Sequence, residues 1–316
     1  MHYITISTIA NCELENNQTI RIDKSQIIGY LPTSNEIPYF TPKLHYIMGR
    51  ARLDTIHNNI VYSSILISKE TNGPYQVADY CYKIQNSVFD FLWYIKDHSI
   101  ESTIQFCYSK DLTKFVESIN GVNYCDSTCE FKSTTINQEE INKAIEIMNL
   151  YRKYDSNPYK PIQNNFEYKK IFNSSLDFNK YDLTKLNRLE RTHITLKNAR
   201  KSMIITMKIA LYCSVLEHLF NYNHKKITES ISTSTANYIA LSQQEANEIK
   251  KIVREGYKIR SNFVHGRKQK YTQHSEYAEI SNKLDDYIRR CFHLIYNGHI
   301  DLLNTDQLLS VVKNKF

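Results

Sequence analysis

The sequence predicts an α+β N-terminal domain followed by an all-α helical bundle, and three observations support this fold class. The chain has 316 residues, which is more than the usual size of one domain. Its 7 glycines and 6 prolines are few, which favours long helices over a turn-rich all-β fold. The hydrophobic pattern also changes along the chain, from short β-branched runs within residues 1–70 to helical spacing beyond residue 183.

The N-terminal α+β domain is expected over residues 1–153. Its strands are predicted where β-branched and aromatic residues run between polar turns, at Ile4–Ile9, Thr19–Ile22 and Ile60–Ser68. Apolar residues at spacings of three and four predict helices over Gln76–His98 and Gln138–Tyr151. Trp93, the single tryptophan, lies beside the apolar stripe of the first helix, so we assign it to packing rather than to base stacking.

Residues 154–182 are the predicted linker, because residues 154–165 carry two prolines and are mostly polar. The helical bundle is expected over residues 183–316. Helices are predicted over Leu183–Arg200 and over Met203–Phe220, which is apolar on nearly every face and should be buried at the centre. A capping box at Ser242–Glu245 opens the next helix, and Gly298 is expected to stop the last one, Ser275–Asn297.

The net charge of +7 allows a polyanionic partner without requiring one. Positive charge is dense between Lys250 and Lys270, where eight Lys or Arg residues accompany a single acid, Glu255. Such a run is typical of a solvated helix face, and the same pattern suits contacts with an RNA backbone.

The seven cysteines are dispersed, and only Cys125 and Cys129 are close together, with no second pair or nearby His to complete a zinc site. We therefore expect no metal and no cofactor, and free thiols in a reducing compartment. No basic segment followed by an apolar core begins the chain, and no uncharged apolar stretch approaches about 18 residues. These features predict a cytoplasmic protein without a membrane segment.

The helix opened by Ser242 carries an arginine where its periodicity predicts an apolar side chain. The inward stripe continues through Tyr257, Arg260 and Val264. A buried guanidinium without a partner is costly. Glu217 interrupts the apolar central helix, and a buried carboxylate without a partner is costly for the same reason. We therefore predict a contact between Glu217 and Arg260, either in a functional site or as an ordinary buried ion pair.

His265 favours a functional site. It follows Arg260 by five positions within the basic run, and Gly266 next to it predicts a helix stop. Five positions turn a helix by about 140°, so the two side chains cannot point along one narrow face. They can converge if the helix ends there, or if two copies of the motif meet across an interface.

The segment KIRSNFVHGRK at 258–268 resembles the signature of the HEPN superfamily, an Arg and a His separated by four to six residues. The preceding ALYCSVLEHLF at 210–220 resembles the second helix of the Apea-like HEPN branch. The resemblance covers residues 183–300, including the helix order and the positions of Glu217, Arg260 and His265. It implies an HEPN helical bundle and a metal-independent endoribonuclease built from two HEPN units, in prokaryotic anti-phage defence or toxin-like growth arrest.

The side chains suit RNA cleavage by attack of the 2′-hydroxyl. His265 would transfer protons near neutral pH, and Arg260 would bind phosphate oxygens through its fork of donors. Asn262 would position a phosphate or the 2′-hydroxyl, and Glu217 completes the predicted catalytic set. The predicted RNA-binding residues, which would follow the backbone without reading bases, are Lys258, Ser261, Arg267 and Lys268.

The expected partners are RNA and a second copy of the chain, joined as a homodimer through the HEPN domain. By elimination, the N-terminal domain is expected to sense, recruit or restrain, and a regulatory protein or phage trigger would bind there. One alternative is a non-catalytic HEPN module that binds nucleotide or protein. Ser261 favours it, because many active members place Asn, Asp or His directly after the Arg. A second alternative is a structural helical protein in which the Arg260–Glu217 pair is merely internal.

Overall fold

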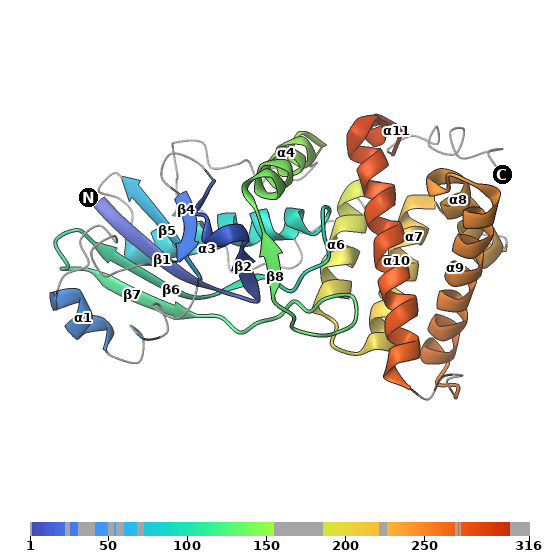
Figure 1. The fold of residues 1–316 in the computed structure, drawn as a ribbon, viewed down its shortest axis with the longest axis horizontal. Helices are drawn as coiled ribbons and strands as arrows, with labels where there is room; N and C mark the ends of the chain where they lie inside the picture. The colour runs from blue at the N-terminus through green and yellow to red at the C-terminus, as the bar shows by residue number, and fades with distance from the viewer. Residues whose placement is uncertain are drawn as a thin grey trace.

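The structure is a computed structural model that describes residues 2–22, 26–30, 42–49, 54, 60–67, 73–154, 186–220, 226–268, 271 and 273–303. Within these ranges, strands and helices form an N-terminal half, and helices alone form a C-terminal half beside it (Figure 1). The predicted order, an α+β region followed by an all-α region, is confirmed.

The N-terminal half is built on an antiparallel sheet, which in the described ranges has six strands in the order β3-β4-β5-β1-β6-β7. At its centre, Thr5 of β1 lies opposite Ser64 of β5 and Cys107 of β6. A short parallel pair, β2 (Cys12–Leu14) and β8 (Thr134–Ile136), forms a second sheet. The strands of the large sheet are β1 (His2–Ala10), β3 (Ile20–Arg21), β4 (Gln26–Tyr30), β5 (Ile60–Ile67), β6 (Glu101–Ser109) and β7 (Phe115–Ile119).

The three predicted strands are confirmed as β1, β3 and β5, each within two residues of its expected ends. β6 lies outside the predictions. Its consecutive residues Phe106, Cys107 and Tyr108 are all buried, so the strand is covered on both faces. A strand of this kind lacks the alternation of polar and apolar residues from which strands are predicted.

Helices of the N-terminal half are α1 (Pro42–Met48), α3 (Pro74–Leu92) and α4 (Gln138–Tyr154), with a 3-10 turn, η1 (Glu15–Asn17). α3 packs on β6 and β1 and against α4. The expected extension of α3 to His98 is wrong, because the chain turns after Leu92 and buries Trp93 and Tyr94. Trp93 is 0% exposed, so its assignment to packing is confirmed.

The C-terminal half is a bundle centred on α7, which contacts α6, α8, α9 and α10. The predicted central helix is therefore confirmed. The helices are α6 (Arg188–Lys201), α7 (Ile205–Phe220), α8 (Ile227–Ile239), α9 (Gln243–Val264) and α10 (His274–Leu294), followed by a π-helical turn, η3 (Ile295–His299), and α11 (Ile300–Leu303). In these described ranges no helix is long and apolar enough to cross a membrane.

Local capping explains where the bundle helices begin and end. The expected start of α6 at Leu183 is wrong, because the side chain of Asn187 accepts a hydrogen bond from the Glu190 N–H and starts the helix at Arg188. The predicted helix over Ser275–Asn297 corresponds to α10, which ends three residues early at Leu294; Gly298, with a φ of +139°, lies in the π-helical turn that follows, and α11 comes after it. α8 was not among the predicted helices.

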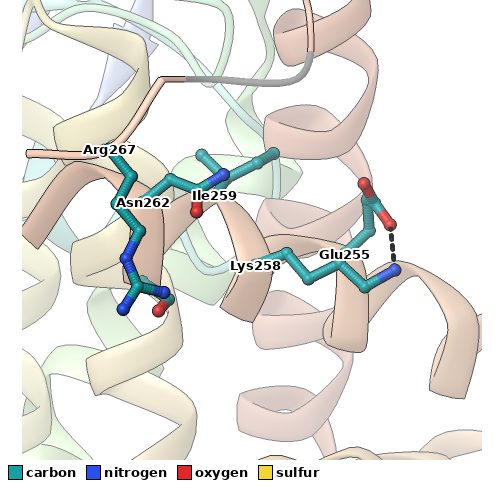
Figure 2. A pocket seen from close by; sticks show the side chains of 6 residues that line it. Glu255, Lys258, Ile259, Asn262 and Arg267 are labelled. Carbon is teal, nitrogen blue, oxygen red and sulfur yellow. Dashed lines mark hydrogen bonds and ion pairs between the residues drawn. The ribbon is translucent and has the colours of Figure 1, made fainter. Parts of the chain in front are cut away.

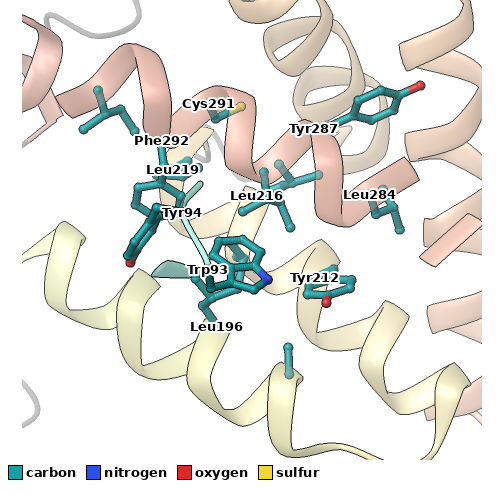
Figure 3. Packing of buried hydrophobic residues seen from close by; sticks show 14 of the residues in the cluster. Trp93, Tyr94, Leu196, Tyr212, Leu216, Leu219, Leu284, Tyr287, Cys291 and Phe292 are labelled. Carbon is teal, nitrogen blue, oxygen red and sulfur yellow. The ribbon is translucent and has the colours of Figure 1, made fainter. Parts of the chain in front are cut away.

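One apolar core runs through both halves. Trp93 and Tyr94, which directly follow α3, pack among Leu196 of α6, Leu216 of α7 and Phe292 of α10 (Figure 3). The rings of Tyr94 and Phe292 meet edge to face with centroids 4.8 Å apart. Of the predicted linker, Tyr154 ends α4 and residues 155–182 lie outside the described residues.

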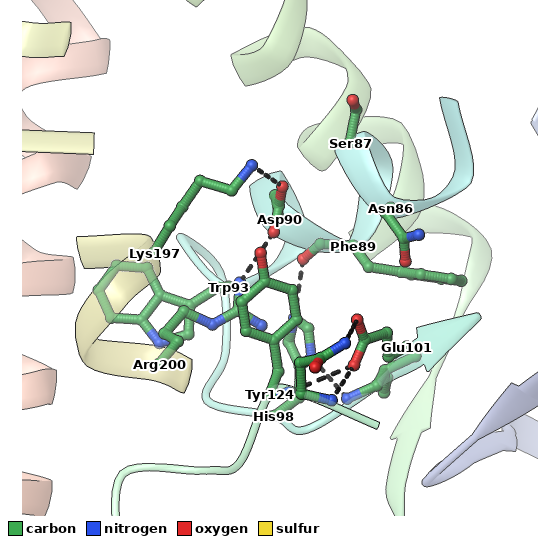
Figure 4. Close-up of polar contacts among 12 residues, drawn as sticks. Asn86, Ser87, Phe89, Asp90, Trp93, His98, Glu101, Tyr124, Lys197 and Arg200 are labelled. Carbon is green, nitrogen blue, oxygen red and sulfur yellow. Dashed lines mark hydrogen bonds and ion pairs between the residues drawn. The ribbon is translucent and has the colours of Figure 1, made fainter. Parts of the chain in front are cut away.

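Buried polar groups cross the same junction (Figure 4). Asp90 of α3 accepts from Lys197 Nζ at 2.6 Å and from Arg200 Nη1 at 3.4 Å, both on α6. Trp93 Nε1 donates to Asp285 Oδ1 of α10 at 3.1 Å. A buried charge without a partner is costly, so these contacts favour the observed placement of the sheet-containing half on the bundle.

Candidate functional site at the C-terminal end of α9

The packing of α9 sets the position of the candidate site. Ser242 Oγ accepts a hydrogen bond from the Glu245 N–H at 3.2 Å, which confirms the predicted start of this helix. At Gly256, a Cβ atom would lie 2.9 Å from Leu284 of α10 and 3.3 Å from Cys213 Sγ of α7. The backbone of α9 therefore approaches both neighbours closely. The inner face is fully buried at Ala246, Ile249 and Val253.

The predicted contact between Glu217 and Arg260 is confirmed. Arg260 Nη1 lies 3.0 Å from Glu217 Oε1, and Nη2 donates to Oε2 at 3.4 Å, so the pair is bidentate. Tyr257 also donates to Glu217 Oε1 at 3.0 Å, and burial raises the pKa of its hydroxyl, which stays protonated. The side chains of Arg260 and Glu217 are 33% and 19% exposed, so the pair lies at an edge of the bundle rather than inside it.

The end of α9 is a Schellman turn. His265 is the C-cap, and Gly266 follows with a φ of +61°. The Gly266 N–H donates to the Phe263 carbonyl at 3.3 Å, and the Arg267 N–H donates to the Asn262 carbonyl at 2.8 Å. The predicted helix stop at Gly266 is confirmed, and the turn leads Arg267 back beside α9.

Val264 departs from the predicted inward stripe. Its side chain is 63% exposed, and Phe263 beside it is also exposed. The inward stripe ends at Arg260 because the last turn of α9 extends beyond its buried contacts. His265 and Lys268 are likewise exposed at this end of the helix.

A pocket of about 320 Å³ lies beside this end of α9. Figure 2 shows Arg267 and Asn262 at one side of it and the Lys258–Glu255 pair at the other. Lys258 Nζ lies 3.1 Å from Glu255 Oε2, and the Tyr271 hydroxyl donates to Glu255 Oε1 at 2.9 Å. The six lining residues are Glu255, Lys258, Ile259, Ser261, Asn262 and Arg267.

The structure brings together some of the predicted site residues and separates others. Four predicted polar residues line the pocket: Lys258, Ser261, Asn262 and Arg267. Arg260 and Glu217 do not line it and form a separate pair on the side of α9 that faces α7. His265 and Lys268 do not line it either. Arg260 and His265 are therefore not brought together at this pocket, and their positions differ by about 140° around the helix.

Three residues of this region were missed as site residues. Glu255 stands out in the sequence as the single acid of a basic run, and its spacing of seven positions from Asn262 places both on one face of the helix. The apolar stripe predicts Tyr257 as a core residue, and in the structure its hydroxyl also donates to Glu217. Tyr271 lies beyond the helix stop, and nothing in its local sequence indicates that it returns to Glu255.

The described ranges contain no group of three or more His, Cys, Asp or Glu side chains that could hold a metal ion. The positive side chains of the pocket suit an anion, and Glu255 is neutralised by Lys258. An arrangement of this kind can bind phosphate oxygens through Lys258 and Arg267 and a polar group through Asn262.

Comparison with known proteins gives no match: no protein-family model, no curated protein and no solved structure is significantly similar to the chain.

Proposed function

We propose that the protein is a metal-independent endoribonuclease of the HEPN type, which cuts RNA by attack of the RNA's own 2′-hydroxyl. The observation that carries this proposal is the pocket at the C-terminal end of α9, where Lys258, Asn262 and Arg267 gather. His265 is exposed at the same helix end. One end of α9 thus carries cations that can bind phosphate, an amide that can both donate and accept hydrogen bonds, and a group that can transfer protons.

The chemistry follows from these side chains. The 2′-hydroxyl must lose a proton and the leaving 5′-oxygen must gain one, and an imidazole such as that of His265 can do either near neutral pH. Lys258 and Arg267 would hold the phosphate, and Arg260 would stabilise charge that develops on the phosphorane. Arg260 retains N–H donors beyond the two that Glu217 accepts.

A second copy of the chain would complete the site. Arg260 faces α7, and His265 is exposed beyond the last turn of α9, so one chain supplies the two groups on different sides. A two-fold contact through the helical halves would place Arg260 of one copy near His265 of the other. Phe263 and Val264, apolar and exposed beside His265, suit such a contact.

The setting that goes with this activity is anti-phage defence or toxin-like growth arrest in the cytoplasm. The sheet-containing half would then bind a regulatory protein or phage trigger. Its contacts with α6 and α10, through Asp90 and Trp93, supply a physical route by which such binding would reach the bundle.

A second candidate is a non-catalytic HEPN module that binds a nucleotide. The observation that favours it is the state of Arg260, which Glu217 holds by two contacts while the pocket lies elsewhere. A pocket of about 320 Å³ lined by Lys258 and Arg267 suits the phosphates of a single nucleotide.

The two candidates are separated by incubating purified protein with end-labelled RNA in excess EDTA. The endonuclease should cut, leaving 2′,3′-cyclic phosphate or 3′-phosphate ends and 5′-hydroxyl ends, and an all-2′-O-methyl RNA should resist. Binding without any cleavage would favour the nucleotide-binding module. Cleavage that requires magnesium, or that leaves 5′-phosphate ends, would contradict the proposed mechanism.

A further inference from the structure

Two cysteines meet at the joint between the sheet-containing half and the helical bundle. Cys125 Sγ lies 3.3 Å from the Ser202 carbonyl oxygen, and Cys129 Sγ lies 3.5 Å from the same oxygen. Cys125 Sγ also lies 3.4 Å from the Arg200 carbonyl oxygen. Cys125 is buried, whereas Cys129 is partly exposed, so the pair reaches solvent through one of its sulfurs.

The turn that carries the pair is held in one conformation. Asp126 Oδ1 accepts from the backbone N–H groups of Thr128 at 2.9 Å and Glu130 at 2.8 Å. Cys129 has a φ of +66°, a backbone conformation that residues other than glycine adopt only at an energetic cost. The Cys125 N–H donates to the Arg200 carbonyl at 3.1 Å, which fastens the turn to the end of α6.

A buried cation lies against this pair. Lys208 of α7 is 0% exposed, and its ammonium donates at 3.5 Å to the Arg200 carbonyl, the same oxygen that Cys125 Sγ approaches. In the described part of the chain, no carboxylate forms an ion pair with Lys208. A buried ammonium without an ion-paired carboxylate is costly, and a thiolate at Cys125 would add a counter-charge to the electrostatic attraction of Asp285.

These surroundings shift the pKa values of the two thiols in opposite directions. The neighbouring Cys129, with the Lys208 ammonium, outweighs burial and lowers the pKa of Cys125 below its usual value. The neighbouring Cys125 and burial raise the pKa of Cys129. By contrast, burial raises the pKa of each of Cys12, Cys107 and Cys213 to about 12.

We propose that Cys125 and Cys129 form a reversible oxidation site for a small peroxide, with Cys125 as the attacking sulfur and Cys129 as the resolving one. The inference rests on the convergence of both sulfurs on one carbonyl beside a buried ammonium. It does not depend on RNA cleavage. Thiolates rather than thiols react with peroxides, and a neighbouring thiol converts the first product to a disulfide.

The reaction balances in two steps. The Cys125 thiolate attacks one peroxide oxygen, an S–O bond forms, the O–O bond breaks, and hydroxide leaves and takes up a proton as water. Cys129 then attacks the Cys125 sulfur, an S–S bond forms, the S–O bond breaks, and the departing oxygen leaves as a second water with the Cys129 proton. Two thiols and one hydrogen peroxide give one disulfide and two waters, and a dithiol reductant reverses the change.

Oxidation at this turn would affect the start of α10 in the helical bundle, because the turn contacts that helix. Ser127 accepts a hydrogen bond from Ser281 of α10 and donates one to Asn282 at 3.2 Å. His274, the first residue of α10, contacts the Thr128 carbonyl at 3.1 Å. A disulfide would draw Cys129 from Ser202 and remove the charge beside Lys208, so the start of α10 would exchange its amide hydrogens faster.

The test uses the full chain, reduced and then treated with hydrogen peroxide at pH 7, alkylated with N-ethylmaleimide and digested with trypsin. Both cysteines fall in one tryptic peptide, Phe115–Lys132, which contains no other cysteine. We expect this peptide to lose two hydrogen atoms and to escape alkylation before the remaining cysteines react, and dithiothreitol to restore it. If its thiols stay alkylatable while other cysteines oxidise first, the proposal is wrong.

Variants assign the two roles. Cys129→Ser should stop at a sulfenic acid on Cys125 that dimedone traps, and Lys208→Met should slow the reaction by about ten-fold because less thiolate forms. Cys12→Ser, which removes another buried cysteine, should leave the oxidation rate of the peptide unchanged. Oxidation of Cys129 at the wild-type rate in Cys125→Ser would overturn the assignment. The peptide measurement on the unaltered chain stands even if a variant fails to fold.

Discussion

At the scale of single residues, the C-terminal end of α9 separates residues that hold the fold from those free to react. Arg260 is paired with Glu217, and Glu217 also accepts a hydrogen bond from Tyr257, so these three residues help to stabilise the fold. His265 is exposed as the C-cap of α9, with its backbone rather than its ring fastened by the helix end. Function and stability should therefore respond differently to changes at Arg260 and at His265.

The first prediction follows from that difference. His265→Ala should lower RNA cleavage by about a hundred-fold or more, the usual range for loss of a proton-transfer group, with an unchanged melting temperature. His293→Ala, which removes an exposed histidine near the C-terminal end of α10, is the matched control and should cut RNA at the wild-type rate. A folded His265→Ala protein that cuts at the wild-type rate would refute the assignment.

At the scale of elements, the Schellman turn after α9 positions Arg267 in the pocket. Gly266 makes this turn possible because its φ of +61° is costly for any residue with a side chain. A Cβ at this position would meet nothing within 4 Å, so backbone strain is the expected effect of a substitution there.

The second prediction tests this turn. Gly266→Ala should destabilise the protein by about 1 kcal/mol, seen in urea unfolding, and should weaken RNA binding because Arg267 is displaced. Gly266→Asn should cost less, since Asn tolerates this conformation better. Gly121→Ala is the control, because that glycine also has open space around it but no positive φ. Equal stability of the Gly266→Ala and Gly121→Ala variants would count against a strained turn.

At the scale of the whole molecule, the junction buries titratable groups that couple stability to pH. His193 of α6 is bonded to the Tyr94 hydroxyl at 2.7 Å and stacks on Phe91, with ring centroids 5.3 Å apart. Burial, aided by Lys197, lowers the pKa of His193 to about 3. Burial also lowers the pKa of His98. Both rings are therefore neutral in the folded protein.

The third prediction is the resulting pH dependence. Below about pH 6.5 the unfolded chain binds a proton at each of these histidines and the folded chain does not, so stability is full above that pH and falls as pH decreases towards 3. Each group contributes at most about 1.4 kcal/mol per pH unit. His193→Gln should reduce the loss between pH 7 and 5, measured by urea unfolding, and His293→Gln should not. An unchanged slope in His193→Gln would contradict the neutral buried imidazole.

The fourth prediction concerns assembly, which also belongs to the whole molecule. If the site combines Arg260 of one copy with His265 of the other, a mixed dimer of Arg260→Ala and His265→Ala chains contains one intact site. Mixing the two inactive proteins, with subunit exchange, should therefore restore part of the cleavage activity. Mixing two separate preparations of His265→Ala is the control. No recovery after proven exchange would mean that each chain carries its own complete site.

Several features of the fold and of the site follow from the sequence alone, because they depend on residues close together in the chain. Apolar spacing predicts α7, α9 and α10. Gly266 predicts the end of α9, and a charged residue in each of two apolar stripes predicts the pairing of Arg260 with Glu217. The last inference reaches across the chain because an unpaired charge at a buried position is too costly to leave alone.

Only the tertiary structure decides the remaining features, because they depend on contacts between residues far apart in the sequence. Trp93 and Asp285 meet across the junction, and the Tyr271 hydroxyl donates to Glu255, which lines the pocket. The cysteines of a short turn acquire a buried ammonium from Lys208. Local sequence determines which helix face is apolar. It does not determine which distant segment will cover that face, since that choice depends on the packing of the whole core.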